Sequence, residues 1–272
     1  MSGFSPAWLA LREQADSRAR WPAAVALLLQ RRAGADVVRI VDLGSGTGAN
    51  CRHLAPRLGV AQDWLLVDHD AALLGHAVDA CRGTPGLRNL RTQCCDLLQD
   101  LQALPLTHAW LLTASALLDL VSEAWLVRLA DHCQSAGLPV LLALSYDGRL
   151  RCEPVDADDD WIRETINAHQ RRDKGFGPAL GPDATRRARA LFEERGYAVA
   201  CGRSDWRLDT TEPALQRELL RGWAAAAAEQ RPGDAGRATT WLARRLAWLE
   251  SGTSTLVVGH EDLLALPPPG SD

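Results

Sequence analysis

An acidic residue followed by three alternating glycines occupies residues 42–48, within the string Val-Asp-Leu-Gly-Ser-Gly-Thr-Gly-Ala-Asn at 41–50. The β-branched run 37–40 before it predicts a buried strand, and residues 51–58 after it predict a helix that ends at Gly59. A strand that turns on glycines into a helix presents bare backbone N–H groups and a helix N-terminus to a ligand. We therefore expect this turn to bind a ligand.

Two classes of ligand fit the turn. Gly44, Gly46 and Ala49 match the dinucleotide pattern G-x-G-x-x-G/A, which is followed by an acid about twenty residues further on. Asp42 favours another ligand, because a carboxylate at the strand end would repel a pyrophosphate but could hold an ammonium group or a sugar hydroxyl. The glycines alone leave both interpretations open.

The composition disfavours several classes of protein, among them nucleic-acid-binding, secreted and membrane-spanning proteins. The chain has 272 residues, a net charge of −4 and a pI near 6.0, with no long basic block, and this disfavours a nucleic-acid partner. The seven cysteines have no Cys-x-x-Cys spacing, so we expect reduced thiols, a cytoplasmic location and no metal site. The N-terminus does not resemble a secretory segment, and the longest apolar runs are too short to span a bilayer.

Predicted strands alternate with predicted helices along the chain. This alternation indicates an α/β fold with a doubly wound, mostly parallel sheet of seven strands. After the first strand at 37–40, the predicted strands are 63–68, 87–96, 107–113, 138–145, 197–201 and 253–259.

The remaining segments define the expected domain organisation. Residues 1–35 form an N-terminal helical segment that covers the ligand site, and residues 36–262 form the core. The core carries insertions at 146–182 and 210–251, and residues 263–272 form a flexible tail. The second insertion has the apolar spacing of two helices, which we expect to lie over the carboxyl end of the sheet as a cap.

The glycine turn resembles motif I of the class I S-adenosylmethionine-dependent methyltransferases, D/E-x-G-x-G-x-G, with Asp42, Gly44, Gly46 and Gly48 at the defined positions. Residues 36–145 follow the order of that family, with motifs at the ends of four successive strands. The resemblance implies a Rossmann-like fold with S-adenosylmethionine as the cofactor and S-adenosylhomocysteine as the product.

The resemblance also implies roles for individual residues. Asp68 would bind both ribose hydroxyls, His69 would lie against the adenine, and Asp96 would meet the adenine amino group with Leu97 beside the ring. Arginines 12, 18 and 20 are candidates for the cofactor's carboxylate. The expected cofactor-binding residues are Asp42, Gly44, Ser45, Gly46, Gly48, Asp68, His69, Asp96, Leu97, Thr113 and Arg18.

The expected reaction is an in-line attack of an O, N or C atom on the methyl group of a sulfonium, for which positioning supplies much of the rate. A general base is needed only when the nucleophile carries a proton. The candidate catalytic residues are Asp119, Tyr146 and His169, and Asp147 lies next to the second of them.

The acceptor is expected to be a small molecule. The family's DNA-amino motif Asn/Asp-Pro-Pro-Tyr is absent after the fourth strand, where Thr113-Ala-Ser-Ala stands, and the two insertions fit a lid over an enclosed substrate. Two other functions remain open: an NAD or FAD oxidoreductase, and a non-catalytic protein of the same fold that binds S-adenosylmethionine. The sequence does not predict the oligomeric state.

Overall fold

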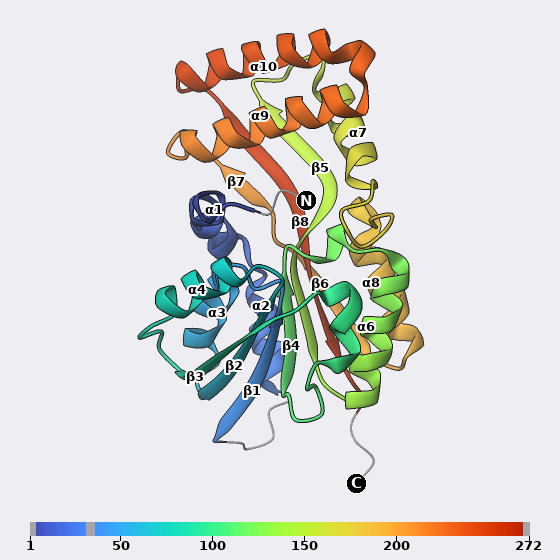
Figure 1. The fold of residues 1–272 in the computed structure, drawn as a ribbon. Helices are drawn as coiled ribbons and strands as arrows, with labels where there is room; N and C mark the ends of the chain where they lie inside the picture. The colour runs from blue at the N-terminus through green and yellow to red at the C-terminus, as the bar shows by residue number, and fades with distance from the viewer. Residues whose placement is uncertain (1–3, 31–35, 269–272) are drawn as a thin grey trace.

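The computed structural model describes residues 4–30 and 36–268, which form two lobes connected by two long strands (Figure 1). The lower lobe in this view is an α/β sheet with helices on both faces. The upper lobe, which we call the cap, consists of three helices mounted on the ends of the long strands. Residues 1–3 and 31–35 of the expected N-terminal segment and 269–272 of the expected tail lie outside the described residues.

The sheet confirms the prediction of a doubly wound, mostly parallel arrangement. Its strand order is β3-β2-β1-β4-β5-β8-β6; β1 to β5 run parallel, and β8 runs antiparallel to β5 and β6. The order reverses between β1 and β4, which is where open α/β sheets bind ligands. The strands on this path are β1 Val37–Leu43, β2 Ala61–Asp68, β3 Leu87–Cys94, β4 Leu111–Ser115, β5 Val140–Glu153, β6 Ala198–Arg203 and β8 Thr255–Leu266.

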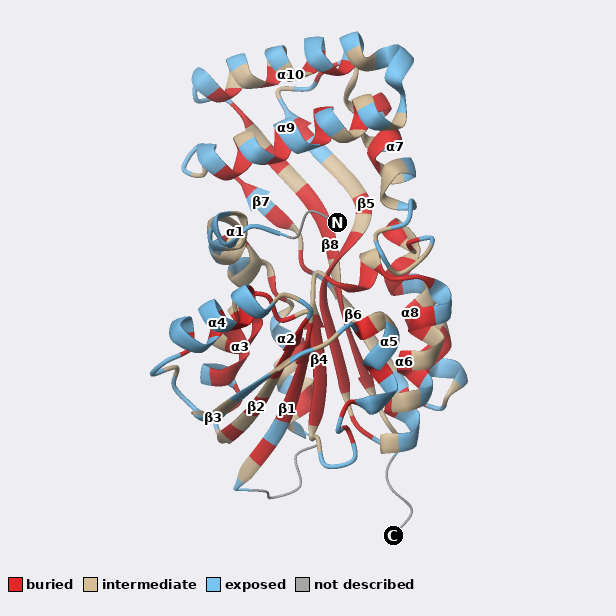
Figure 2. Cartoon of the chain, viewed as in Figure 1, coloured by how far each residue is buried: buried red, intermediate tan, exposed pale blue. Residues whose placement is uncertain are grey.

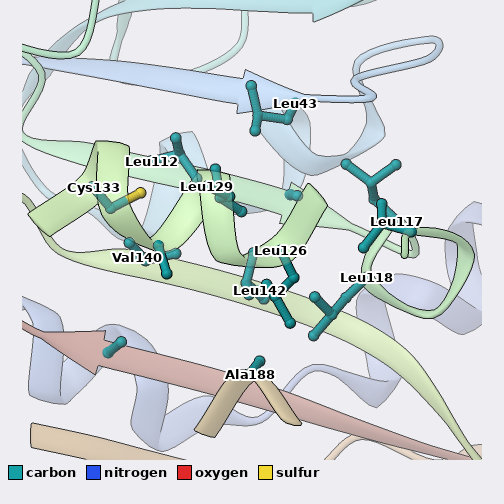
Figure 3. Close-up of a cluster of buried hydrophobic side chains, with 14 of the residues drawn as sticks. Leu43, Leu112, Leu117, Leu118, Leu126, Leu129, Cys133, Val140, Leu142 and Ala188 are labelled. Atoms are coloured by element: carbon teal, nitrogen blue, oxygen red, sulfur yellow. The ribbon is translucent and has the colours of Figure 1, made fainter. Parts of the chain in front are cut away.

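Apolar side chains fill the space between the sheet and the helices on each face, and the central strands are buried along most of their length (Figure 2). On one face, leucines of β1, β4 and β5 pack against α6 (Figure 3). The helices on that face are α5 Leu97–Asp100, α6 Glu123–Ala136 and α8 Ala184–Glu194; on the other face are α2 Pro22–Gln30, α3 Ala49–Leu54 and α4 Ala71–Ala80. Short 3-10 turns are η1 Ala55–Arg57, η2 Leu101–Ala103, η3 Leu118–Leu120, η4 Gly181–Asp183 and η5 Pro232–Asp234.

Strands β5 and β8 are longer than the sequence predicted. Their antiparallel pairing runs from Val140↔Ala265 to Glu153↔Thr255, beyond the edge of the parallel sheet. The first insertion therefore begins as a continuation of β5, and residues 263–266 belong to β8 rather than to the tail. The sequence did not predict these extensions. The pairing register changes at two irregularities, and the apolar alternation that marks a strand is interrupted there.

The cap is built on this two-stranded extension. An eighth strand, β7 Trp206–Leu208, pairs with β8; its three residues are too few to show a period in the sequence. The helices α7 Asp159–Gln170, α9 Pro213–Gln230 and α10 Ala235–Glu250 complete the cap, and α1 Pro6–Ala19 packs against β7. Among the residues that the structure describes, no helix is long and apolar enough to cross a membrane.

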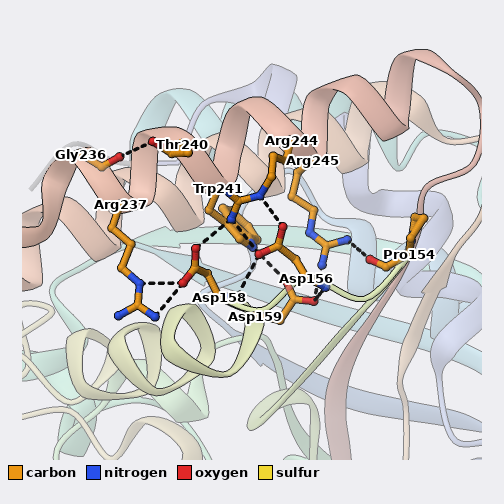
Figure 4. Close-up of polar contacts among 10 residues, drawn as sticks. All are labelled: Pro154, Asp156, Asp158, Asp159, Gly236, Arg237, Thr240, Trp241, Arg244 and Arg245. Atoms are coloured by element: carbon orange, nitrogen blue, oxygen red, sulfur yellow. Dashed lines mark hydrogen bonds and ion pairs between the residues drawn. The ribbon is translucent and has the colours of Figure 1, made fainter.

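Ion pairs attach α10 to the start of α7 and to the residues just before it (Figure 4). Arg245 is fully buried and binds the Asp159 carboxylate, whose second oxygen accepts a hydrogen bond of 2.8 Å from Trp241 Nε1. Beside this pair, Arg244 binds Asp156 with N···O distances of 2.5 and 2.8 Å. Acidic residues of the first insertion therefore neutralise arginines of the second insertion.

We predict that Asp159→Ala lowers the free energy of unfolding by about 3–5 kcal/mol, because it leaves the buried Arg245 guanidinium without a carboxylate. The matched control is Asp160→Ala in the same helical turn; its side chain is 82% exposed, and its ion pair with Arg163 is expected to contribute less than about 1 kcal/mol. Urea denaturation of both variants measures the difference. Equal losses would show that the Arg245 pair does not hold the cap.

Candidate functional site

The glycine turn joins β1 to α3 with three residues in the left-handed region. Gly44, Gly46 and Gly48 have φ values of +60°, +51° and +80°, which residues other than glycine rarely adopt. Backbone hydrogen bonds hold the turn against β2, since Ser45 N donates to Val67 O at 3.0 Å and Gly46 N donates to Asp68 Oδ2 at 2.8 Å. These bonds fix the turn at the carboxyl edge of the sheet, at the switch point between β1 and β4 where the strand order reverses.

A cavity of about 360 Å³, which we call the loop pocket, opens over this turn. It lies between the ends of β1, β2 and β4 and the helix α1, as a ligand site at a switch point requires. Seven of the predicted residues line it: Gly44, Ser45, Gly46, Asp68, His69, Asp96 and Leu97. Its other lining residues are Phe4, Leu9, Arg12, Asp16, Thr47, Ala49, Asn50, Leu73, Ser115, Ala116, Leu117, Leu120, Lys174, Gly175 and Phe176.

Two carboxylates in the loop pocket also organise the backbone around it. Asp68 accepts from Gly46 N and, at 3.0 Å, from Asp70 N, while His69 Nδ1 lies 3.2 Å from Asp68 Oδ1. Asp96 caps α5, accepting from Leu98 N at 2.8 Å. A carboxylate has about four acceptor sites, so each side chain can accept further hydrogen bonds from a ligand.

Three predicted residues lie behind the turn instead of in the pocket. Asp42 is fully buried and accepts a hydrogen bond of 2.7 Å from Asn50 Nδ2, which also donates to Thr113 Oγ1 at 3.1 Å. Burial raises the pKa of Asp42 to about 7, although the hydrogen bond from Asn50 opposes the shift. Gly48 packs against α4, where a Cβ would meet Cys81 Sγ at 2.7 Å. Asp42, Thr113 and Gly48 therefore do not line the loop pocket in this structure, and their predicted part in cofactor binding stays a prediction.

Arg18, the arginine predicted to bind the cofactor, does not line the loop pocket either. Its side chain is more than half exposed and pairs with Glu212, away from both cavities. Arg12, on the same helix, lines the loop pocket and is held by Asp16 through N···O distances of 3.0 and 3.2 Å. Arg20 is buried below the pocket, where its Nη2 donates to Asn50 Oδ1 and Ser115 Oγ.

A second cavity, of about 270 Å³, lies between the sheet and the cap, and we call it the cap pocket. The three predicted catalytic residues, Asp119, Tyr146 and His169, all line it, whereas Asp147 is bound to Arg149 outside it. The other lining residues are Phe4, Trp8, Arg12, Ala116, Leu120, Leu144, Ile166, Gln170, Trp206, Leu219, Gly222, Trp223, Ala226, Val258 and His260.

The titratable groups of the cap pocket have altered pKa values. Burial raises the pKa of Asp119 to about 6, against the attraction of Arg12. Partial burial and the nearby Lys174 ammonium lower the pKa of His169, whose Nδ1 lies 3.3 Å from Lys174 Nζ. Burial raises the pKa of the Tyr146 hydroxyl, which donates to Asn167 Oδ1 at 2.7 Å. Asp119 is therefore the group best suited to take up a proton near neutral pH.

The sequence did not indicate the aromatic wall of the cap pocket. Trp206 and His260 lie with their ring centroids 5.0 Å apart, and Trp8 and Trp223 also line the cavity. These residues come from β7, β8, α1 and α9, and each fits an ordinary apolar position of its own element. No local pattern could have grouped them, because only the fold brings them together.

We predict that Gly48→Ala destabilises the protein more than Gly59→Ala does. Both glycines have positive φ, so each alanine costs about 1–2 kcal/mol. At Gly59 a Cβ meets nothing within 4 Å, but at Gly48 it meets Cys81 Sγ at 2.7 Å and adds about 1–3 kcal/mol. Urea denaturation measures both losses, and equal values would mean that α3 and α4 are not closely packed.

Known proteins resemble this chain in structure. No family model and no curated protein sequence matches the chain. The YcgJ protein of Bacillus subtilis is similar with a TM-score of 0.52 and 13% identity over 91% of this chain and 99% of that one. Phosphoethanolamine N-methyltransferase 2 of Haemonchus contortus, in complex with phosphomonomethylethanolamine and S-adenosylhomocysteine, is similar with a TM-score of 0.50 and 12% identity, over 98% of this chain and 59% of that one. The chain thus has the class I methyltransferase fold that its glycine turn implied.

Proposed function

We propose that this protein is an S-adenosylmethionine-dependent methyltransferase that acts on a small molecule held in the cap pocket. The observation that carries the proposal is the junction of two cavities of different character. The loop pocket has a glycine turn and three carboxylates, of which Asp16 is paired with Arg12, and the cap pocket has aromatic walls and one buried carboxylate. They share the lining residues Phe4, Arg12, Ala116 and Leu120, so a group bound in one borders on a group bound in the other.

The residues of the loop pocket fit S-adenosylmethionine. Ser45 Oγ is buried without a hydrogen-bond partner among the described residues, which leaves it free for a ligand. Gly46 has only Leu9 Cδ1 near the place of a Cβ, at 3.2 Å, so the missing side chain leaves space beside the turn. The acceptor sites still free on Asp68 and Asp96 suit ribose hydroxyls and an amino group.

When bound, S-adenosylmethionine would supply a methyl group on a sulfonium sulfur, whose bond to carbon would break as the acceptor's bond forms, with a neutral thioether as the leaving group. The chain's own contribution is to align the acceptor and to exclude water from the junction. Asp119 would accept the proton that a hydroxyl acceptor releases, and Tyr146 would help to keep the cap in place through its bond to Asn167. The seven cysteines are free thiols, which supports a reducing cytoplasm as the place of action.

Calorimetric titration with S-adenosylmethionine, S-adenosylhomocysteine and NADH tests the cofactor. We expect micromolar binding of both adenosyl compounds and none of NADH. Binding of NADH alone would replace the proposal by an oxidoreductase. Binding of the adenosyl compounds without turnover of any acceptor in a broad screen would indicate a non-catalytic binding protein.

Substitutions in the loop pocket test the assignment of the site. Gly46→Val is expected to abolish binding of S-adenosylhomocysteine, because its side chain would fill the space beside the turn. Asp68→Ala should weaken binding by about 1.5–3 kcal/mol, or roughly 10- to 150-fold, through lost charge-assisted hydrogen bonds. The control is Asp63→Ala at the other end of β2, which pairs with Arg88. If both variants bind S-adenosylhomocysteine as tightly as the wild type, the loop pocket is not the cofactor site.

The proposed base predicts a pH dependence once an acceptor is known. Since Asp119 must be ionised to take a proton, kcat should fall as the pH drops below about 6. Asp119→Asn should lower kcat by about 10²- to 10⁴-fold and remove this limb of the profile, with unchanged affinity for S-adenosylhomocysteine. Tyr146→Phe, which loses only a bond to Asn167, is the comparison, with about tenfold loss or less. An acidic limb that persists in Asp119→Asn would contradict the assignment.

A further inference from the structure

The cap pocket has walls that select for shape. Indole rings of Trp8, Trp206 and Trp223 and the ring of Tyr146 line it, and the imidazole of His260 lies against Trp206. Aromatic rings pack best edge-to-face or offset-stacked against other flat rings, with centroids about 4.5–7 Å apart. Tyr146 and His260 already stand edge-to-face at 6.3 Å. A flat ring system can extend this packing, whereas a flexible chain would lose conformational freedom for fewer contacts.

The charges around the cap pocket disfavour an ionic occupant. Both nitrogens of Arg12 that face Asp16 are engaged with its carboxylate, and the guanidinium carbon lies 5.0 Å from the Trp206 ring centre. The Asp16 carboxylate thereby offsets the charge of Arg12, and Asp119 would repel an anion. A cation would meet a Trp206 ring that Arg12 already covers, with the Lys174 ammonium beside His169. An uncharged molecule avoids both conflicts.

Asp119 is the one carboxylate of the cap pocket, and it belongs to no ion pair within the described part of the chain. It is buried in the turn η3, which follows the strand end that carries Ala116. A buried carboxylate without a counter-ion is stabilised by a hydrogen-bond donor on the occupant. An aromatic hydroxyl is such a donor, and its weak acidity allows the proton to pass to the carboxylate.

We propose that the cap pocket binds an uncharged, flat aromatic molecule of one or two fused rings, whose hydroxyl group donates a hydrogen bond to Asp119. The cavity volume of about 270 Å³ fits an occupant of this size. As a statement about the methyl acceptor, the proposal rests on the function proposed above. As a statement about binding, it concerns the cap pocket alone and is tested without the cofactor.

Binding of 2-naphthol, measured by calorimetry with and without S-adenosylhomocysteine, tests the proposal. The comparison compounds are naphthalene, 2-naphthoate and 2-naphthylmethylammonium, which have the same ring system but lack the hydroxyl or carry a charge. We expect 2-naphthol to bind at least tenfold more tightly than each of them. Tighter binding of either ion, or no preference for the hydroxyl, would overturn the proposal.

Gly222 offers a variant that blocks the cap pocket without straining the fold. It lines the cavity from α9, and a Cβ there meets no atom within 4 Å. Gly222→Phe should weaken 2-naphthol binding at least tenfold and leave the affinity for S-adenosylhomocysteine unchanged. The matched control is Gly236→Phe on α10, which also has open space and lies outside both pockets. Equal affinity in Gly222→Phe and wild type would show that the compound binds elsewhere.

The two proposals can fail separately. If S-adenosylhomocysteine binds and none of the naphthyl compounds does, the aromatic occupant is excluded and the proposed cofactor stands. If 2-naphthol binds in the Gly222-dependent manner and S-adenosylhomocysteine does not, the proposed methyl transfer is excluded and the character of the cap pocket stands. Asp119→Asn adds a separate measurement, since it should weaken 2-naphthol about tenfold and leave naphthalene unchanged.

Discussion

The pairing of β5 with β8 is the constraint on which the two-lobed structure depends. These strands pair antiparallel in the main sheet and remain paired in the cap, with register irregularities between Leu142 and Ser145 and between Tyr146 and Leu150. Such irregularities bend and twist a strand pair, so the ribbon leaves the sheet and carries the cap helices above its carboxyl edge. Residues near the bend, among them Leu144, Tyr146 and His260, line the cap pocket. The position of the second pocket therefore follows from the same pairing that holds the lobes together.

Buried carboxylates are paired with arginines in the cap but not in the cap pocket. In the cap, the acids Asp156, Asp158 and Asp159 are each bound to arginines of α10, and these pairs are structural. In the cap pocket, Asp119 has no such partner among the described residues, and burial raises its pKa. Arginines neutralise the three cap carboxylates, whereas Asp119 has no counter-ion among the described residues. The difference supports a chemical role for Asp119, because burial without a partner costs stability.

The sequence predicted correctly the position of residues that directly follow the end of a strand. The glycine turn, Asp68 and Asp96 follow directly from strand ends, so their place at the switch point could be predicted. It did not indicate hydrogen bonds and cavity contacts that depend on residues elsewhere in the fold. Asp42 Oδ1 accepts a hydrogen bond from Asn50, while its Oδ2 is buried without a partner among the described residues, and nothing in the motif indicates this arrangement. On α1 the polar residues do not form a single face, so the spacing could not distinguish Arg18 from Arg12, which faces both pockets.

Backbone strain gives an independent reason to regard the cap pocket as functional. Among the described residues, only Ala116 and Leu144 have a positive φ without being glycine, and both line this pocket. Such a conformation costs of order 1–3 kcal/mol and persists only where the surroundings enforce it. Here Ala116 N donates to Ala143 O at 2.9 Å, and Leu144 N donates to Asp262 Oδ1 at 2.8 Å. Glycine would relieve the strain at either position. The two non-glycine residues with a positive φ in the described part of the chain therefore share one cavity wall, which supports the ligand site proposed there.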